Sequence, residues 1–307
     1  MIKLLVGIPS YRRPVELRKC LETVSAQTDL AEIDVRVLVA DNDPEQREGL
    51  CVAEELAESF PFQLKAQLVE APGISAVRNV ILDHANYWGA DFIAMIDDDE
   101  SADPGWLRTL VYVQRQFNAD VVGGPSIPFF QGPVSSEIIH SKAFSYNAQE
   151  GDGPVPIVHA TNNVLLSRNA LLRLGAPEFD DAFGLTGGGD KEFFTRLKNQ
   201  GASFAWASKA ITYELVPASR MTTRWILRRN YRIGVDDVRI ALMHEGTVSS
   251  LRKIAEAVVM VAAIPLTAPA LLVPRWRLRM MRRWTRAFGR LSAVRGRYYG
   301  EYAALRS

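Results

Sequence analysis

The sequence has few residues of the kinds that crosslink small folds. Among its 307 residues there are only two cysteines, Cys20 and Cys51, with no CxxC pair and no cluster of histidine with cysteine. Neither a disulfide framework nor a structural zinc site is therefore expected. Because nothing calls for an oxidising compartment, a reducing, cytosolic setting fits best.

Long hydrophobic segments are also scarce. The N-terminal stretch MIKLLVGIPSYRRP has a short apolar run but no small-residue cleavage site, so it predicts a first strand rather than a signal peptide. Residues 254–274 are apolar except for Glu256 and are about long enough to cross a ~30 Å hydrocarbon core. Pro265, Pro269 and Pro274 interrupt this segment, so it does not have the pattern of a simple span.

An excess of charge is absent overall but present locally. The net charge is +1, yet residues 252–307 carry twelve Lys or Arg against Glu256 and Glu301, a balance of +10 that leaves −9 for residues 1–251. Basic residues lie on both sides of the 254–274 segment, and the positive-inside bias would keep both flanks cytosolic. A re-entrant hairpin or a surface-lying helix pair satisfies both features.

The composition of the basic C-terminal region indicates what kind of surface it binds. Trp, Leu, Met and Phe are interspersed among its arginines, a mixture suited to an anionic lipid interface. An ordinary packed helix that happens to be basic is the alternative. Nucleic acid is disfavoured, because the neighbouring apolar run would then have no role. We therefore expect residues 252–307 to be an amphipathic, helical, membrane-associating extension.

Strand and helix patterns alternate along the rest of the chain, which predicts an α/β fold with a mostly parallel sheet. A helix is expected from Pro104 to Phe117 with Asp103 as its cap, and residues 125–160 are expected to be loops. The predicted strands are Ile2 to Ile8, Ile33 to Val39, Leu64 to Val69, Phe92 to Ile96 and Val121 to Val122.

Unusual polar residues directly follow these strands. They are Pro9-Ser-Tyr-Arg-Arg13, Asp41-Asn-Asp43, Ala71 to Asn79 and the acids Asp97 to Glu100. Open α/β sheets bind ligands at the carboxyl ends of their strands, so we expect these residues to converge on one cleft.

The acids follow a buried strand in the stretch IAMIDDDESADPGW. If the strand continued, Asp97 and Asp99 would share one face while Asp98 pointed elsewhere. Such a pair offers hard oxygen ligands for Mg²⁺ or Mn²⁺, with phosphate oxygens of a nucleoside diphosphate and water completing the shell. A solvated acidic turn is the other interpretation.

Five motifs occur together: IPSYRRP, VLVADND, PGISAVRN, AMIDDDESADPGW and FGLTGGGDKEFFTRL. In this order and spacing the chain resembles the family 2 inverting glycosyltransferases of GT-A fold, specifically the non-processive members that build bacterial surface polysaccharides. The resemblance covers roughly residues 2 to 240. It implies a Rossmann-like GT-A catalytic domain over residues 1–218 and a helical connector over 219–251 that completes the active site, followed by the membrane-associating region 252–307.

The resemblance also implies roles for individual residues. Asp97 and Asp99 match the DxD positions, Asp97 toward the ribose and the metal and Asp99 as a direct ligand of Mn²⁺ or Mg²⁺. The residues implied to bind the nucleotide are Pro9, Tyr11, Arg12, Asp41, Arg78, Asn79 and Asp97. Those implied to face the donor sugar or the acceptor are Thr161, Asn162, Gly188, Gly189, Glu192 and Arg224, with Asn163 beside them.

Asp190 is implied to be the catalytic base that takes the acceptor proton. It follows three glycines at the apparent start of a helix, so a helix N-cap is the structural alternative. The sequence departs from the family here, because Gly189 occupies a position where many members carry glutamate, and Glu192 is the nearest substitute.

The motif Arg220-Met-Thr-Thr-Arg-Trp225 resembles the QxxRW element of processive synthases, but Met221 replaces the glutamine, so single-sugar transfer is expected. The resemblance thus implies a nucleotide-sugar donor, most commonly a UDP-sugar. The basic, apolar C-terminal region indicates a lipid-linked glycan acceptor at the cytoplasmic face of the bacterial inner membrane. Two alternatives stay open at this point. One is a non-catalytic nucleotide- or sugar-binding scaffold, and the other is a sugar nucleotidyltransferase, although IPSYRRP lacks the expected glycine.

Overall fold

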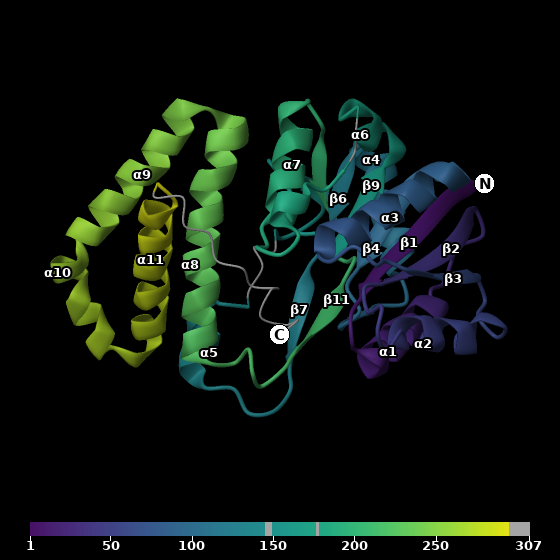
Figure 1. Ribbon diagram of the computed structural model, residues 1–307, viewed down its shortest axis with the longest axis horizontal. Coiled ribbons are helices and arrows are strands. Elements are labelled where there is room, and N and C mark those ends of the chain that lie inside the picture. The colour runs from purple at the N-terminus through teal and green to yellow at the C-terminus, as the bar shows by residue number, and fades with distance from the viewer. Residues whose placement is uncertain (145–148, 176–177, 295–307) are drawn as a thin grey trace. The chain divides into compact units, whose positions relative to one another are not determined.

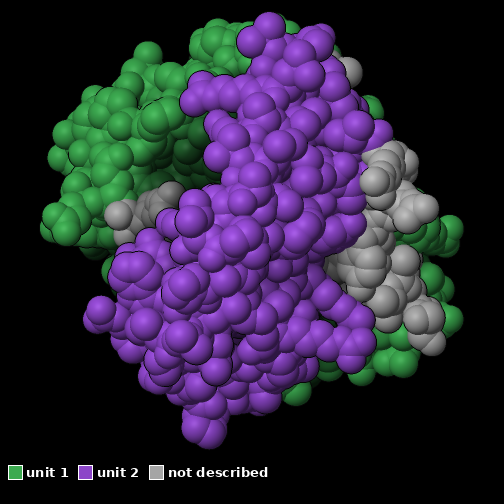
Figure 2. Space-filling model, turned by 90° about the vertical axis from the view of Figure 1, so that its left-hand side faces the viewer, with its two compact units in different colours: residues 1–127, 146–214, 302–307 green, residues 128–145, 215–301 purple. Residues whose placement is uncertain are grey.

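The computed structural model describes residues 1–144, 149–175 and 178–294 of the chain. Within these ranges it forms two compact units (Figure 2), one of residues 1–127, 149–175 and 178–214 and the other of residues 128–144 and 215–294. The expected connector, residues 219–251, and the start of the expected membrane region therefore belong to one unit, together with residues 128–144.

The predicted strands form the central sheet of the first unit. Among the described residues its order is β3-β2-β1-β4-β9-β6-β10-β8. The pairs β1–β2, β2–β3, β1–β4 and β6–β10 are parallel, whereas β9 is antiparallel to β4 and β6, and β8 is antiparallel to β10. The fold is thus α/β with a mixed, mostly parallel sheet. The strands are β1 (Ile2–Ser10), β2 (Ile33–Asp41), β3 (Gln63–Leu68), β4 (Phe92–Ile96), β6 (Val121–Gly123), β8 (Gly153–Pro154), β9 (Asn163–Ser167) and β10 (Phe204–Trp206).

Both faces of this sheet are buried, which explains why its strands have continuous apolar runs rather than alternation. Along β1, Leu4, Val6 and Ile8 pack into one core and Leu5 packs into the other. Burying each such side chain stabilises the fold by about 1.5–3 kcal/mol. The first core is covered by α1 (Pro14–Ser25), α2 (Glu48–Ala57) and α4 (Trp106–Phe117), and the second by α3 (Ile74–Trp88), α6 (Arg168–Arg173) and α7 (Gly189–Asn199).

Three local predictions were wrong. Helix α4 begins at Trp106 with Gly105 as its N-cap, because the backbone first makes a turn at 104–105, so Asp103 does not cap it. Residues 125–160 are not all loop, since they contain β7 (Ser126–Phe130), α5 (Ser136–Ser141) and β8. Strand β4 ends at Ile96 as predicted, but the acids after it do not continue in an extended conformation. They form a turn that leads into β5 (Glu100–Ala102), which pairs with β11 (Thr212–Val216).

The second unit is mainly helical. It contains α5, α8 (Thr223–Ile240), the π-helical turn η2 (Ala241–Glu245), α9 (Thr247–Ala262), α10 (Ile264–Thr267), the 3₁₀ helix η3 (Ala268–Leu272) and α11 (Pro274–Ala293). Figure 1 shows α11 between α8 and α9. Helices α8 and α11 approach closely where Gly234 faces Gly289, since a Cβ on Gly289 would lie 2.1 Å from the carbonyl oxygen of Tyr231.

The apolar segment of this unit is bent. No single helix of the described residues is both long and apolar enough to cross a membrane, but Thr247–Ala262 and Ile264–Leu272 meet that criterion as a pair bent by 57°. This agrees with the expectation that the segment is not a simple span.

Candidate active site

The polar residues that follow β1, β2 and β4 lie at one edge of the sheet. Since these strands are parallel and Ser10 pairs with Asp41, their carboxyl ends are brought together as the sequence predicted. Figure 1 shows β1 beside β2, with β4 on its other side. Pro9 is buried in β1 just before this edge.

The acidic turn at the end of β4 is bound by Arg13. One guanidinium nitrogen of Arg13, Nη1, lies 2.9 Å from Asp98 Oδ1 and 2.7 Å from Asp99 Oδ2. The backbone N–H of Tyr11 also donates to Asp98, over 3.3 Å. Asp98 and Asp99 therefore share a cation, and the predicted separation of Asp98 from its neighbours was wrong because the chain turns at this point instead of staying extended.

Burial, together with neighbouring carboxylates, raises the pKa values of Asp97 and Asp98. Burial raises the pKa of Asp97 to about 7, with nearby Asp99 and Asp190 adding to the rise and Arg78 opposing it. Burial likewise raises the pKa of Asp98 to about 6 against the effect of Arg13. This edge thus has more carboxylates than its own cations neutralise, as a site for a positively charged ligand requires.

Asp190 is held in place by two partners. The guanidinium of Arg78, which is buried, donates to Asp190 Oδ1, and the hydroxyl of Thr161 donates to Asp190 Oδ2 over 3.0 Å. The N-cap of α7 is Gly188, in a left-handed conformation with φ 88°, so Asp190 lies in the first turn and is not the cap. Its carboxylate is partly exposed at 29% of its side-chain surface and can be reached from solvent.

Other predicted nucleotide-binding residues have structural partners. Buried Asp41 accepts hydrogen bonds from the backbone N–H groups of Asp43 and Leu50, at 3.0 and 3.1 Å. The amide of Asn79 both donates to and accepts from the backbone of Phe179, at 3.0 and 2.7 Å. These contacts fix the loops around the edge of the sheet.

Arg12 pairs with Asp43, a buried acid to which the sequence motifs gave no role. Its Nε lies 3.1 Å from Asp43 Oδ2, and its guanidinium lies over the ring of Tyr11. Although burial acts to raise the pKa of Asp43, the hydrogen bond from Arg12 lowers it below its ordinary value. The pair therefore orients Tyr11 and Arg12 at the end of β1.

Glu100 is a second residue for which the sequence predicted no individual role, although it was among the acids expected at this edge. It is 1% exposed, and its Oε1 accepts hydrogen bonds from Ser126 and from Asn162, at 2.5 and 2.6 Å. Burial, with nearby Asp97 adding to it, raises its pKa well above the ordinary value. Asn162 thus lies beside the acidic turn, whereas Asn163 bonds to Trp106 and to backbone carbonyls in the core.

The remaining predicted residues have contacts of their own or belong to the second unit. Both oxygens of Glu192 accept from Arg196 within α7, at 2.6 and 3.1 Å. A Cβ on Gly189 would meet the side chains of Phe183 and Ser75 at ordinary van der Waals distance. Arg224 belongs to the second unit, where it is exposed on α8.

Sequence comparison identifies the family. Residues 5–173 match the profile of Glycosyl transferase family 2, and residues 92–294 match that of Glycosyl transferase family group 2. Over 229 residues the chain is 32% identical to the succinoglycan biosynthesis protein ExoM of Rhizobium meliloti (strain 1021), which covers 75% of this chain and 72% of ExoM. The chain belongs to glycosyltransferase family 2.

Solved structures agree on the fold of this glycosyltransferase. The fragment 1-349 of TarS from S. aureus matches 97% of the chain and 93% of its own length, with a TM-score of 0.57 at 16% identity. The same fragment in complex with UDP-GlcNAc matches with a TM-score of 0.56 at 15% identity. Against the longer TarS structure, the chain spans 45% of the length. At these identities the likeness establishes a GT-A-like fold alone.

The acids of this glycosyltransferase are of the kind that bind a divalent metal ion. Within the ranges that the structure describes, no group of three or more His, Cys, Asp or Glu side chains could hold a metal by itself. Mg²⁺ is usually bound through one or two carboxylates plus substrate phosphates and water. Asp97 and Asp99 supply such hard oxygen ligands, so this donor set suits Mg²⁺ or Mn²⁺ bound together with a diphosphate.

Proposed function

We propose that this glycosyltransferase transfers a single sugar, with inversion, from a UDP-sugar to a lipid-linked glycan acceptor in bacterial polysaccharide biosynthesis. The observation that carries the proposal is the carboxylate of Asp190, fixed by Arg78 and Thr161 in the same group of charges as Asp97 and Asp99. The relatives support the donor and the pathway, since ExoM is a succinoglycan biosynthesis protein and TarS was crystallised with UDP and with UDP-GlcNAc.

In this proposal Asp190 is the general base. It accepts the proton of the acceptor hydroxyl as the oxygen attacks the anomeric carbon, and the hydrogen bonds from Arg78 and Thr161 keep the carboxylate in one orientation. Asp97 and Asp99 would hold a divalent metal ion, which when bound stabilises the charge of the departing diphosphate. The pair of Arg12 and Asp43 positions Tyr11 against the nucleoside.

Calorimetry tests the donor site. UDP, GDP and dTDP are titrated into the detergent-purified full chain with Mn²⁺ and with EDTA, and the titrations are repeated on Asp99→Asn. We expect binding of UDP that depends on Mn²⁺ and is lost in the variant. Failure of the folded protein to bind any of the three nucleotides would overturn the assignment of donor and metal.

The second unit supports action at the cytoplasmic face of the inner membrane. On α9, Val248, Leu251 and Val258 share one face by their spacing and are exposed to 83%, 58% and 51%, and Leu266 of α10 is exposed to 85%. Arginines of α11 follow in the chain, a combination typical of interfacial helices. A stripe of this kind in water is costly unless a membrane covers it.

The membrane association is tested on the intact chain. Removing residues after Arg252 would delete α11, which packs against α5 and α8, and would disrupt the second unit. Leu251→Asp with Val258→Asp should instead abolish flotation with lipid vesicles, while Val15→Asp, at an exposed apolar position in the first unit, should not. Full flotation of the double variant would contradict the assignment of this stripe to the membrane.

A further inference from the structure

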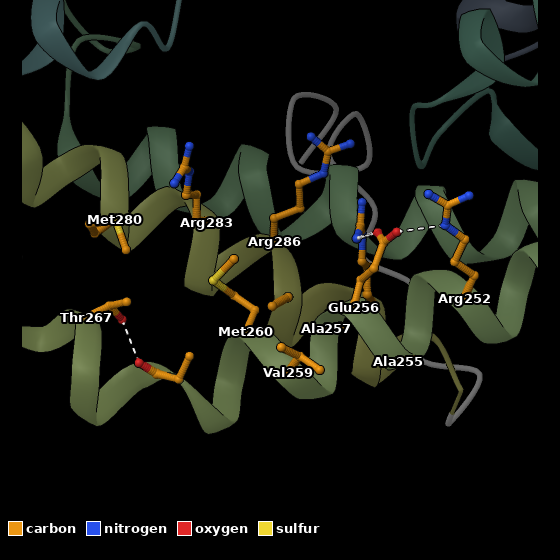
Figure 3. A pocket seen from close by; sticks show the side chains of 13 residues that line it. Arg252, Ala255, Glu256, Ala257, Val259, Met260, Thr267, Met280, Arg283 and Arg286 are labelled. Atoms are coloured by element: carbon orange, nitrogen blue, oxygen red, sulfur yellow. Dashed lines mark hydrogen bonds and ion pairs between the residues drawn. The ribbon is translucent and has the colours of Figure 1, made fainter.

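A hollow of about 750 Å³ lies between α9, α10 and α11 of the second unit (Figure 3). This volume falls in the range of roughly 300–1,000 Å³ that small-molecule sites occupy. Its wall is made of small and apolar side chains, which are Ala255, Ala257, Val259, Met260, Ala263, Met280 and Ala287. At one end Trp284 donates a hydrogen bond to Thr267 over 3.2 Å and ties α11 to α10.

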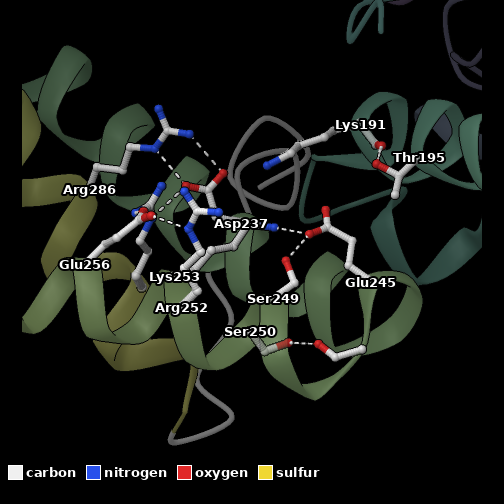
Figure 4. A network of polar contacts seen from close by, with 12 residues as sticks. Lys191, Thr195, Asp237, Glu245, Ser249, Ser250, Arg252, Lys253, Glu256 and Arg286 are labelled. Atoms are coloured by element: carbon white, nitrogen blue, oxygen red, sulfur yellow. Dashed lines mark hydrogen bonds and ion pairs between the residues drawn. The ribbon is translucent and has the colours of Figure 1, made fainter. Parts of the chain in front are cut away.

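Charge is concentrated on one rim of the hollow. Four arginines line it, which are Arg252, Arg283, Arg286 and Arg290. Two carboxylates balance part of this charge: Asp237 pairs with Arg286 at 2.8 Å and with Arg290 at 2.9 Å, and Glu256 bridges Arg252 and Arg290 at 3.1 Å each (Figure 4). About two positive charges therefore remain.

Arg283 carries much of this unbalanced charge. It is exposed, and no carboxylate of a described residue forms an ion pair with it. Figure 3 shows Arg283 and Arg286 beside each other on the α11 side of the hollow, with Met260 on the α9 side. A ligand that suits this arrangement needs an anionic group at the two guanidiniums and an apolar chain below them.

We propose that this hollow binds an anionic phospholipid, with its phosphate at Arg283 and Arg286 and an acyl chain between α9 and α11. The inference rests on the membrane association proposed above and adds a defined lipid site to it. The stripe of Val248, Leu251 and Val258 is on the same helix and would enter the bilayer, so lipid is the ligand available at highest local concentration. Arg283 can bind the phosphate by paired, charge-assisted hydrogen bonds. Arg286, whose Nε and Nη2 already donate to Asp237, has Nη1 left for it.

Native mass spectrometry of the full chain in detergent tests the site directly. Phosphatidylglycerol and phosphatidylcholine are added separately, and we expect one phosphatidylglycerol to be retained per chain. Arg283→Gln should lower this retention about fivefold, because one arginine near an anionic lipid is worth about 1 kcal/mol. The matched control is Arg275→Gln, which removes the same charge from an exposed position on α11 outside the hollow.

A second pair of variants tests the apolar part. Ala255→Trp places a large side chain in the hollow from an exposed position, whereas Ala262→Trp adds the same group at an exposed position of α9 outside it. Retention of phosphatidylglycerol should be lost in Ala255→Trp and kept in Ala262→Trp. Because both positions are exposed, neither change should unfold α9.

The possible results separate this inference from the proposed function. Equal retention in all four variants would overturn the lipid site, while flotation of the parent chain with vesicles would leave the membrane association standing. Retention of an added polyisoprenyl phosphate in place of phosphatidylglycerol would also overturn the phospholipid site. The hollow would then be assigned to the lipid that carries the glycan acceptor. If the parent chain neither floats with anionic vesicles nor retains lipid, both proposals fail.

Discussion

Raising the pH should destabilise the metal-free protein near neutrality, and Asp97 should be the main cause. Its pKa in the folded protein is about 7, against 3.8 for an ordinary aspartate. Between these values the folded state binds a proton that the unfolded chain has released, so the free energy of unfolding falls as the pH rises. Above about pH 7 both states are ionised and the dependence on this group ends.

The magnitude follows from the width of that window. One proton over the 1.5 units from pH 5.5 to pH 7 corresponds to about 2 kcal/mol, because each unit is worth about 1.4 kcal/mol. Asp98, whose pKa is about 6, adds to the decline at the lower end. Asp97→Asn cannot titrate and should remove about 2 kcal/mol of the difference between pH 5.5 and pH 8.

Urea unfolding at pH 5.5 and pH 8 in EDTA measures this difference, with Asp97→Asn compared with the parent chain at each pH. Because Asp97 also raises the pKa of Glu100, the comparison measures Asp97 together with the acid that it perturbs. A parent chain whose stability is the same at both pH values, or higher at pH 8, would refute the account of an unneutralised acidic cluster. So would an unchanged pH dependence in Asp97→Asn.

Three further predictions concern the site and the second unit. Asp190→Asn should lower incorporation of labelled sugar into the lipid fraction of membranes by about 100- to 10,000-fold, with UDP affinity by calorimetry nearly unchanged; equal activity would exclude it as the base. Arg13→Ala should lower the melting temperature more without UDP and Mn²⁺ than with them, because Arg13 neutralises acids that the bound metal would neutralise. A larger drop in the presence of UDP and Mn²⁺ would contradict this. Gly289→Ala should lower the free energy of unfolding by about 1–3 kcal/mol through overpacking against α8, whereas exposed Arg279→Ala on the same helix should change it little.

The parallel half of the sheet could be predicted from the sequence because its signals are local. Leu4, Val6 and Ile8 form a continuous apolar run since both faces of β1 are covered, and such a run is visible without knowing the partners. The carboxyl-end rule then placed the residues after β1, β2 and β4 at one edge. The antiparallel strand β9 and the helix α5 within residues 125–160 were missed, because their short segments carry weak periodic signals.

The ion pairs of the site were not predictable in the same way. Arg13 meets Asp98 across 85 residues of sequence because β1 and β4 are neighbours in the sheet. The pairing of Arg78 with Asp190 likewise joins α3 to α7 across 112 residues. The arginines of IPSYRRP and the acids of DDDE have opposite charges, which indicates that they could pair. Which arginine reaches which acid is decided only by the order of the strands in the sheet.

The sequence by itself thus determined the fold class, the family motifs and the basic, apolar character of the C-terminal region, because composition and periodicity report local burial. Only the tertiary structure decided that the acids lie on a turn, that Asp190 is held by Arg78 and Thr161, and that α9 and α11 enclose a hollow rimmed by arginines. The physical reason is that these features depend on distances between segments far apart in the chain, which the packing of strands and helices sets.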